Sequence, residues 1–225
     1  MSSPESVGVE VDIAPSHGGV RVDRVVTSGL FELDGGSWEV DNNVWVVGDE
    51  RECLIIDAAH DADAILEAVA GRKVRAILLT HGHSDHVNVA DELKERTGAP
   101  VHLHPLGRVV WALTQDGAPD STLSDGQEFH VGDVTLRVLH TPGHSPGGCS
   151  FHVPALHAVF TGDTLFNGGP GATGRSFSSF EQIIESIRTR LLTLPAGTVV
   201  LTGHGDHTTI GDEAPHLDEW VARGH

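Results

Sequence analysis

The densest group of chemically active side chains lies between Thr80 and His86, in the sequence Thr-His-Gly-His-Ser-Asp-His. It places His81, His83, Asp85 and His86 directly after the apolar strand sequence AILLT. The strand end fixes the first side chain, and the glycine lets the chain turn tightly enough for the others to face one cleft. Neutral histidine is the commonest metal ligand in proteins. The pattern predicts that His81 and His83 bind one metal ion, while Asp85 and His86 are free to bind a second.

Four ligands cannot complete two metal sites, so further ligands must come from later in the chain. Three candidates also follow predicted strands and stand beside small residues: His144 in TPGHSPG (141–147), Asp163 in GDTLF (162–166) and His204 in GHG (203–205). Because each candidate lies at a strand end, all three can reach the cleft that contains the first group. The sequence therefore predicts a centre built from five histidines and two aspartates.

The elements that position these ligands fall into two similar halves, each with strands before helices. The first half predicts strands at 20–29, 40–47 and 52–57, a helix at 62–70 capped by Asp61, a strand at 74–80, a helix at 89–98 capped by Asn88, and a strand at 100–104. The second half predicts a hairpin at 128–140, strands at 150–153, 157–161 and 198–202, a helix at 180–194 capped by Ser179, and a short terminal helix. Two mixed sheets packed face to face, with helices outside, satisfy this order.

The overall charge and hydropathy limit the partners. Lys and Arg number 14 against 32 Asp and Glu, for a net charge of −18. Such a chain repels a phosphate backbone, so nucleic acid is not an expected partner. No apolar stretch approaches the ~20 residues that cross a bilayer, and no secretory signal pattern opens the chain, so we expect a cytoplasmic protein that does not bind membranes.

The chain is expected to form one domain over residues 20–225, preceded by a loosely ordered polar lead-in over residues 1–19. Cys53 and Cys149 stand in apolar surroundings without the close spacing of a zinc cluster, which predicts two small buried side chains. The sequence makes no prediction of the oligomeric state.

Four motifs, THGHSDH, TPGHSPGG, TGDTLF and TGHG, occur in this order, and the chain from about residue 20 onward resembles the metallo-β-lactamase superfamily. The resemblance is nearest to its glyoxalase II-like (hydroxyacylglutathione hydrolase-like) hydrolases. It implies an α/β fold, a four-layer αβ/βα sandwich with two mixed sheets flanked by helices. It also implies two divalent metal ions, for which zinc is expected and iron is the alternative. The implied ligands are His81, His83 and His144 for the first ion, Asp85, His86 and His204 for the second, and Asp163 between them.

The resemblance implies hydrolysis of a small-molecule substrate by a hydroxide that bridges the two ions. Asp85 would have a second, catalytic role, because its free oxygen can orient this nucleophile. A thiolate is a good leaving group and a soft zinc ligand. We therefore expect the substrate to be a thioester of a low-molecular-weight thiol, an acyl-thiol that can carry negative charge.

Other activities of the superfamily fit the sequence to different degrees. The β-lactamases generally have a cysteine where Asp163 stands, and Cys149 lies too early to replace it. The lactonases commonly place a tyrosine over the substrate carbonyl, and this chain has no tyrosine. A persulfide dioxygenase-like enzyme with a single iron stays open as the alternative. A protein that only buffers metal explains the seven ligand positions less well than an enzyme does, because chelation does not require the bridging carboxylate.

Four further residues are candidates for supporting roles. Asp57 ends the strand sequence LIID and resembles the acid that hydrogen-bonds a metal-binding histidine in this family, although a capping or turn role is the competing interpretation. Asn167 and Arg175 lie in or beside the glycine-rich segment after Asp163 and can contact an anionic thiol substrate. His104 can face the cleft from the strand PVHLH.

Overall fold

The computed structural model describes residues 13–224. The strands are β1 (Arg21–Leu33), β2 (Gly36–Gly48), β3 (Glu52–Ile56), β4 (Lys73–Leu78), β5 (Val101–Leu103), β6 (Ser121–Thr122), β7 (Glu128–Val131), β8 (Val134–His140), β9 (Cys149–Val153), β10 (Ala158–Gly162), β11 (Leu165–Phe166), β12 (Gly169–Pro170), β13 (Val199–Thr202) and β14 (Thr208–Thr209). The helices are α1 (Ala62–Val69), α2 (Ser84–Val87), α3 (Ala90–Thr97), α4 (Arg108–Trp111), α5 (Phe180–Ser186), α6 (Ile210–Glu213) and α7 (Leu217–Arg223). Shorter or irregular turns are η1 (Pro105–Gly107), η2 (Pro154–Leu156), η3 (Ile187–Leu191) and η4 (Ala214–His216).

Within the described range, the strands form two six-stranded mixed sheets and one small hairpin. The first sheet has the order β1-β2-β3-β4-β5-β6, antiparallel from β1 to β3 and parallel from β3 to β6. The second has the order β14-β13-β10-β9-β8-β7 and is antiparallel except for the β10–β13 pair. The hairpin pairs β11 with β12. The prediction of two mixed sheets is confirmed.

Alternating side chains divide the interior into three apolar layers. On β2, Trp45 and Val47 point toward the second sheet, whereas Val44 and Val46 point toward the helices that cover the outer face of the first sheet. Because successive side chains of a strand face opposite sides, one strand serves two layers. A third layer lies between the second sheet and the C-terminal helices, where Val200 packs with the side chains of α5 and α7.

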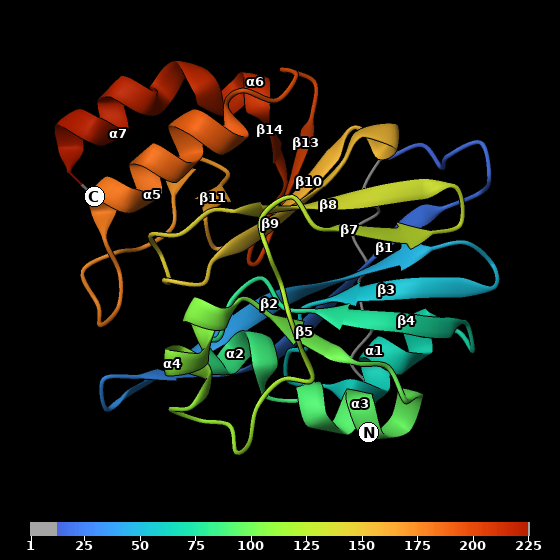
Figure 1. Cartoon of the computed structure of the whole chain (residues 1–225). Helices are drawn as coiled ribbons and strands as arrows, with labels where there is room; N and C mark the ends of the chain where they lie inside the picture. Colours follow the sequence, from blue (N-terminus) through green and yellow to red (C-terminus); the bar gives the residue numbers. More distant parts are fainter. Residues whose placement is uncertain (1–12, 225) are drawn as a thin grey trace, which may run out of the picture.

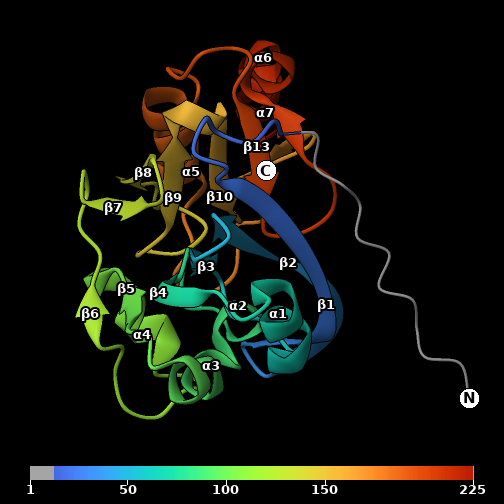
Figure 2. The same ribbon diagram turned by 90° about the vertical axis from the view of Figure 1, so that its right-hand side faces the viewer.

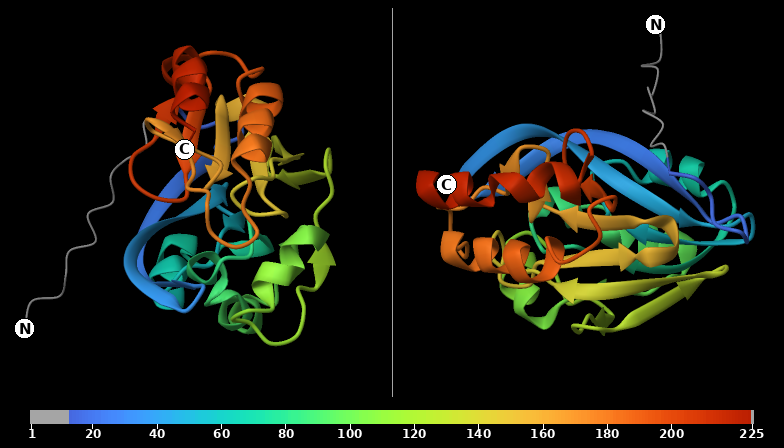
Figure 3. Two further views of the ribbon diagram at one scale, coloured as in Figure 1. Left: turned by 90° about the vertical axis from the view of Figure 1, so that its left-hand side faces the viewer. Right: turned by 90° about the horizontal axis from the view of Figure 1, so that it is seen from above.

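The resulting molecule is a four-layer αβ/βα sandwich, as predicted. Figure 1 shows α1 to α4 below the first sheet, the two sheets face to face, and α5 to α7 above the second sheet. Seen from above, the C-terminal helices lie over the yellow and orange strands of the second sheet (Figure 3). No helix within residues 13–224 combines the length and the apolar character needed to span a bilayer.

The long β1–β2 hairpin extends beyond the predicted strands. Asp34 and Gly35 form its turn with φ of 53° and 77°. Positive φ at both central residues is the geometry of a type I′ hairpin turn, which favours Asp-Gly. The predicted strands end at residue 29 and begin again at residue 40. In the structure the pairing continues through this gap, from the pair of Arg21 with Gly48 to the pair of Leu33 with Gly36. Figure 2 shows the curved β1 running along one side of both layers.

The predicted helix caps are partly correct. Asp61 accepts a hydrogen bond from the Ala64 amide, and Ser179 accepts one from the Gln182 amide. The prediction of Asn88 as a cap is wrong, because α3 begins at Ala90 with Val89 at its N-cap. The helix predicted over 180–194 is regular only to residue 186 and continues as the wider π-helical turn η3.

Two smaller predictions concern the ends and the cysteines. Cys53 and Cys149 are both buried and unpaired, as expected. Of the predicted lead-in, residues 1–12 lie outside the described residues. In the remainder, the Ser16 hydroxyl and the Gly18 amide both donate to Asp133, so this part contacts the β7–β8 turn.

Candidate metal centre

The seven predicted ligands converge at the carboxyl ends of four strands. His81 and His83 follow β4, and the short helix α2 then carries Asp85 and His86. The remaining three ligands follow β8, β10 and β13 of the second sheet: His144, Asp163 and His204. The centre therefore draws its ligands from both sheets.

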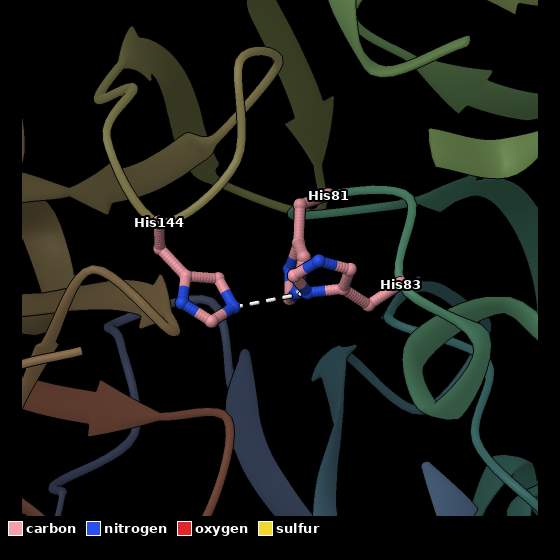
Figure 4. Close-up of side chains that lie close together, drawn as sticks. All are labelled: His81, His83 and His144. Carbon is pink, nitrogen blue, oxygen red and sulfur yellow. Dashed lines mark hydrogen bonds between the residues drawn. The ribbon is translucent and has the colours of Figure 1, made fainter. Parts of the chain in front are cut away.

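The first cluster contains three imidazoles. His81 Nε2 lies 2.9 Å from His83 Nδ1, and His144 Nε2 lies 3.0 Å from the same His83 atom. Figure 4 shows the rings of His81 and His83 from one loop meeting the ring of His144 from another. These three side chains together can hold one metal ion.

The second cluster contains Asp85, His86 and His204. His86 Nε2 and His204 Nε2 are 3.3 Å apart, and His204 Nε2 lies 3.3 Å from Asp85 Oδ2. Asp163 stands between the two clusters: its Oδ1 is 3.3 Å from His86 Nε2, and its Oδ2 is 3.4 Å from both His144 Nε2 and His204 Nε2. The carboxylate can therefore reach an ion in either cluster.

The donor atoms fit divalent cations. Nitrogen and oxygen ligands lie about 2.0–2.2 Å from zinc, so atoms around one ion stand roughly 3.3 Å apart in a tetrahedron. The contacts above span 2.9–3.4 Å. Asp85 Oδ1 is buried without a hydrogen-bond partner, which is costly for a carboxylate unless a bound group meets it. The distances between the donor atoms and the unpartnered Asp85 Oδ1 both agree with the metal-binding interpretation.

Asp57 sets the orientation of two ligand rings. His86 Nδ1 donates to Asp57 Oδ2 over 2.9 Å, so His86 keeps its Nε2 lone pair for a metal. The Thr80 hydroxyl donates to the same carboxylate over 2.9 Å. Since its proton is used there, Thr80 Oγ1 accepts from His81 Nδ1 at 3.0 Å, which also leaves the His81 Nε2 lone pair free. The predicted bond from Asp57 to a ligand histidine is present.

Backbone carbonyl groups orient two further ligands. His144 Nδ1 donates to the Ala172 carbonyl over 2.8 Å, and His204 Nδ1 donates to the Asp41 carbonyl over 2.7 Å. Both rings therefore also present Nε2 to the centre. Sequence reasoning missed these partners, since a carbonyl belongs to every residue type and carries no sequence signal.

The two clusters differ in electrostatics. Burial, together with the neighbouring His144, lowers the pKa of His83 to about 3, and burial lowers the pKa of His81 well below its ordinary value. Burial also disfavours the charged form of His204, but the carboxylates of Asp163 and Asp85 outweigh it and raise its pKa to about 10. His81 and His83 are therefore neutral imidazoles, the form that binds metals, whereas the second cluster favours a positive charge on His204.

A pocket of about 230 Å³ opens onto both clusters. Its apolar wall consists of Phe31, Val40 and Phe166, and Arg175 stands at its edge with Ser176 and Ser178. The Arg175 guanidinium lies 3.8 Å from the ring centroid of Trp38, a cation–π contact. The β1–β2 hairpin provides the lining residues Phe31 and Val40, and also Trp38, which contacts Arg175. Sequence reasoning missed all three. The Asp-Gly turn signal between two apolar runs could have revealed this hairpin.

The predicted substrate residues separate into two groups. Arg175 lines the pocket. His104 is not among the lining residues, and its ring stacks on His140 with the ring centroids 4.0 Å apart. Asn167 is likewise not among the lining residues, and its amide donates to the His207 carbonyl over 3.2 Å. The loop turns its side chain toward the β13–β14 connection instead of the clusters.

The profile of the Metallo-beta-lactamase superfamily matches residues 38–204, a range that includes all seven clustered side chains. The chain belongs to this superfamily. Its His and Asp clusters are consistent with a binuclear metal site.

Two curated proteins illustrate the relatives. The chain is 34% identical over 194 residues to the probable metallo-hydrolase YqgX of Bacillus subtilis, covering 78% of this chain and 92% of that protein. It is 33% identical over 181 residues to the hydroxyacylglutathione hydrolase GloC of Haemophilus influenzae, covering 73% of this chain and 85% of that protein.

Two solved structures share the fold. BLEG-1, a B3 metallo-beta-lactamase, superposes with a TM-score of 0.71 at 30% identity and covers 85% of this chain and 98% of its own. TTHA1623, solved in a di-iron-bound form, superposes with a TM-score of 0.69 at 34% identity and covers 78% of this chain and 93% of its own.

Proposed function

We propose that this metallo-hydrolase cleaves a thioester of a low-molecular-weight, anionic thiol, using two divalent metal ions, with zinc as the preferred metal. The observation that carries the proposal is the pair of ligand clusters joined by Asp163 at the floor of a pocket whose edge holds a guanidinium. The similarity to a hydroxyacylglutathione hydrolase supports the same substrate class.

The chain supplies a complete ligand set for this chemistry. His81, His83 and His144 would hold one ion, Asp85, His86 and His204 the other, and Asp163 would contact both. When bound, such ions polarise a carbonyl and lower the pKa of water toward neutrality. Water adds to the acyl carbon, the C–S bond breaks, and the products are a carboxylic acid and a free thiol.

Asp85 is the residue that would orient the attacking water. Although burial opposes its charge, His86 and the hydrogen bonds from His204 and Asn42 lower the pKa of Asp85 to about 2. It is therefore ionised at neutral pH and can accept a hydrogen bond at Oδ1. Its Oδ2 is already occupied by the Asn42 amide at 3.0 Å.

The pocket wall would bind the two ends of the substrate differently. Phe31, Val40 and Phe166 offer an apolar surface, while Arg175 offers donors for a carboxylate of the thiol. Trp38 holds the guanidinium in place through the ring contact. A charged thiol carrier would then gain affinity that a neutral one lacks.

The test measures thiol release from anionic thioesters and from a neutral acyl-cysteamine ester, alongside a β-lactam and a lactone. We expect turnover of the thioesters, abolished by a chelator. Since a charge-assisted hydrogen bond contributes about 1.5–3 kcal/mol, Arg175→Gln should raise KM roughly tenfold or more for anionic thiols and leave the neutral ester unchanged. Release from no thioester, or preference for the lactam or lactone, contradicts the proposal.

The second candidate is a persulfide dioxygenase-like activity with one iron. The observation that favours it is the first cluster, where three imidazoles can hold an ion without the second cluster. It requires oxygen, whereas hydrolysis does not. Oxygen consumption with a persulfide, measured on the same preparation, separates the two.

A further inference from the structure

Three side chains outside the ligand set form a continuous series of hydrogen bonds that ends on Asp85. Asn88 Nδ2 lies 2.9 Å from His60 Nδ1, and His60 Nε2 lies 2.9 Å from Asn42 Oδ1. The Asn42 amide nitrogen then donates to Asp85 Oδ2 at 3.0 Å and lies 3.2 Å from His86 Nε2. Asn42 is fully buried, so its amide has no water as an alternative partner.

The direction of each bond follows from the groups involved. An amide NH₂ can only donate, so His60 Nδ1 must accept from Asn88. In a neutral ring the proton then resides on Nε2, which donates to Asn42 Oδ1. This leaves only one orientation for the Asn42 amide, with its nitrogen toward Asp85. A flipped amide would place its oxygen against the carboxylate, and the two would repel.

The backbone is shaped to seat the His60 ring. His60 adopts φ of 60°, in the left-handed region that L-residues rarely occupy. Its backbone amide donates to Asn88 Oδ1 over 2.7 Å, which holds this conformation. On β1, a Cβ atom at Gly29 would lie 2.2 Å from His60 Nδ1, so only glycine leaves room for the ring.

We infer that Asn42 is a positioning residue for the second metal cluster and that His60, held by Asn88, fixes the orientation of its amide. By holding Asp85 Oδ2, Asn42 directs this oxygen toward His86 and His204 and leaves Oδ1 for the pocket. The inference rests on the metal centre of the proposed function and is independent of the thioester substrate.

The experiment titrates Zn²⁺ into the metal-free, full-length protein in competition with a chromophoric chelator, which yields a dissociation constant for each site. Removing a group that orients a metal ligand typically weakens metal affinity 10–100-fold. We expect Asn42→Ala to weaken the second site in this range, and His60→Leu to weaken it about tenfold, the lower end. The first site should keep its affinity in both variants.

Two further variants make the result specific. His60→Gln retains a donor near the position of Nε2 and should restore most of the affinity lost in His60→Leu. His102→Leu removes another half-buried histidine, whose ring packs on Phe129 away from the clusters, and should leave both sites unchanged. Thermal unfolding of each metal-free variant verifies that it is folded.

Unchanged affinity at the second site in His60→Leu and Asn42→Ala would overturn the inference, as would equal losses at both sites or no rescue by His60→Gln. Binding of only one ion by the wild-type protein is a different failure, because it would refute the binuclear centre itself. The titration contains no substrate, so a wrong substrate class cannot produce any of these results.

Discussion

At the scale of residues, four of the five clustered imidazoles face an oxygen atom on their other ring nitrogen, and this oxygen fixes the orientation of the ring. Asp57 contacts His86 directly and reaches His81 through Thr80. The carbonyl partners of His144 and His204 act in the same way. A sequence pattern shows which residues can bind a metal, but these oxygen partners decide which ring nitrogen is available.

Replacing Thr80 with valine should therefore weaken the first metal site while keeping the fold. Thr80→Val removes the acceptor for His81 Nδ1, and we expect about a tenfold or greater loss of metal affinity there. The matched control is Thr161→Val, because the buried Thr161 hydroxyl donates to the Leu165 carbonyl and orients no ligand. Equal affinities in Thr80→Val and wild type, measured by chelator competition, would show that the hydroxyl is dispensable.

The raised pKa of His204 makes the stability of the metal-free protein depend on pH. Its folded-state pKa of about 10 exceeds the ordinary 6.5, so its contribution is complete below pH 6.5 and is lost as the pH rises toward 10. His86 shifts in the same direction. In chelator, the free energy of unfolding should fall between pH 6.5 and 8.5 by on the order of 1 kcal/mol per pH unit. Urea unfolding at each pH measures this free energy. A constant or rising free energy of unfolding over this range would contradict the predicted contribution of these ion pairs.

At the scale of elements, the loops after the strands bring the ligands together only where glycine permits close approach. A Cβ atom at Gly203 would lie 2.2 Å from Asp163 Oδ1 and 2.8 Å from His86 Cε1. The loop after β13 thus passes directly beside the bridging carboxylate. A side chain there must displace one ligand or the other.

Gly203→Ala should disturb both metal sites, because Asp163 contacts both clusters. We expect metal affinity to fall about tenfold or more and the free energy of unfolding to fall by about 1–3 kcal/mol, the usual cost of overpacking. Gly197→Ala is the matched control, since nothing lies within 4 Å of its added Cβ. Chelator competition and urea unfolding of the two variants check this; retention of both ions by Gly203→Ala would refute the crowding argument.

The sequence predicted the elements well where local patterns dominate and less well where packing decides. Asp61 and Ser179 cap helices because their side chains bond to the next turn. Asn88 has the same capping chemistry, but the left-handed backbone of His60 provides it with a different partner, which no local pattern shows. His104 follows a strand like several of the clustered residues, yet its ring stacks on His140 and its side chain caps the turn η1 by accepting from the Leu106 amide.

At the scale of the whole molecule, the candidate metal centre lies where the two halves of the sandwich meet. The first sheet and α2 provide four ligands and the second sheet provides three, so the site is complete only when the sheets are packed together. Motif order predicted the seven side chains because each follows a strand. The pocket wall was not predictable in the same way, since the β1–β2 hairpin reaches the site from far away in the sequence.

The most direct measurement is thiol release from an anionic thioester as Zn²⁺ is added to the metal-free protein in known equivalents. We expect activity to rise until two ions are bound per chain, with no consumption of oxygen. Two bound ions without hydrolysis of any thioester would contradict this expectation, and so would one iron per chain with oxygen consumption on a persulfide.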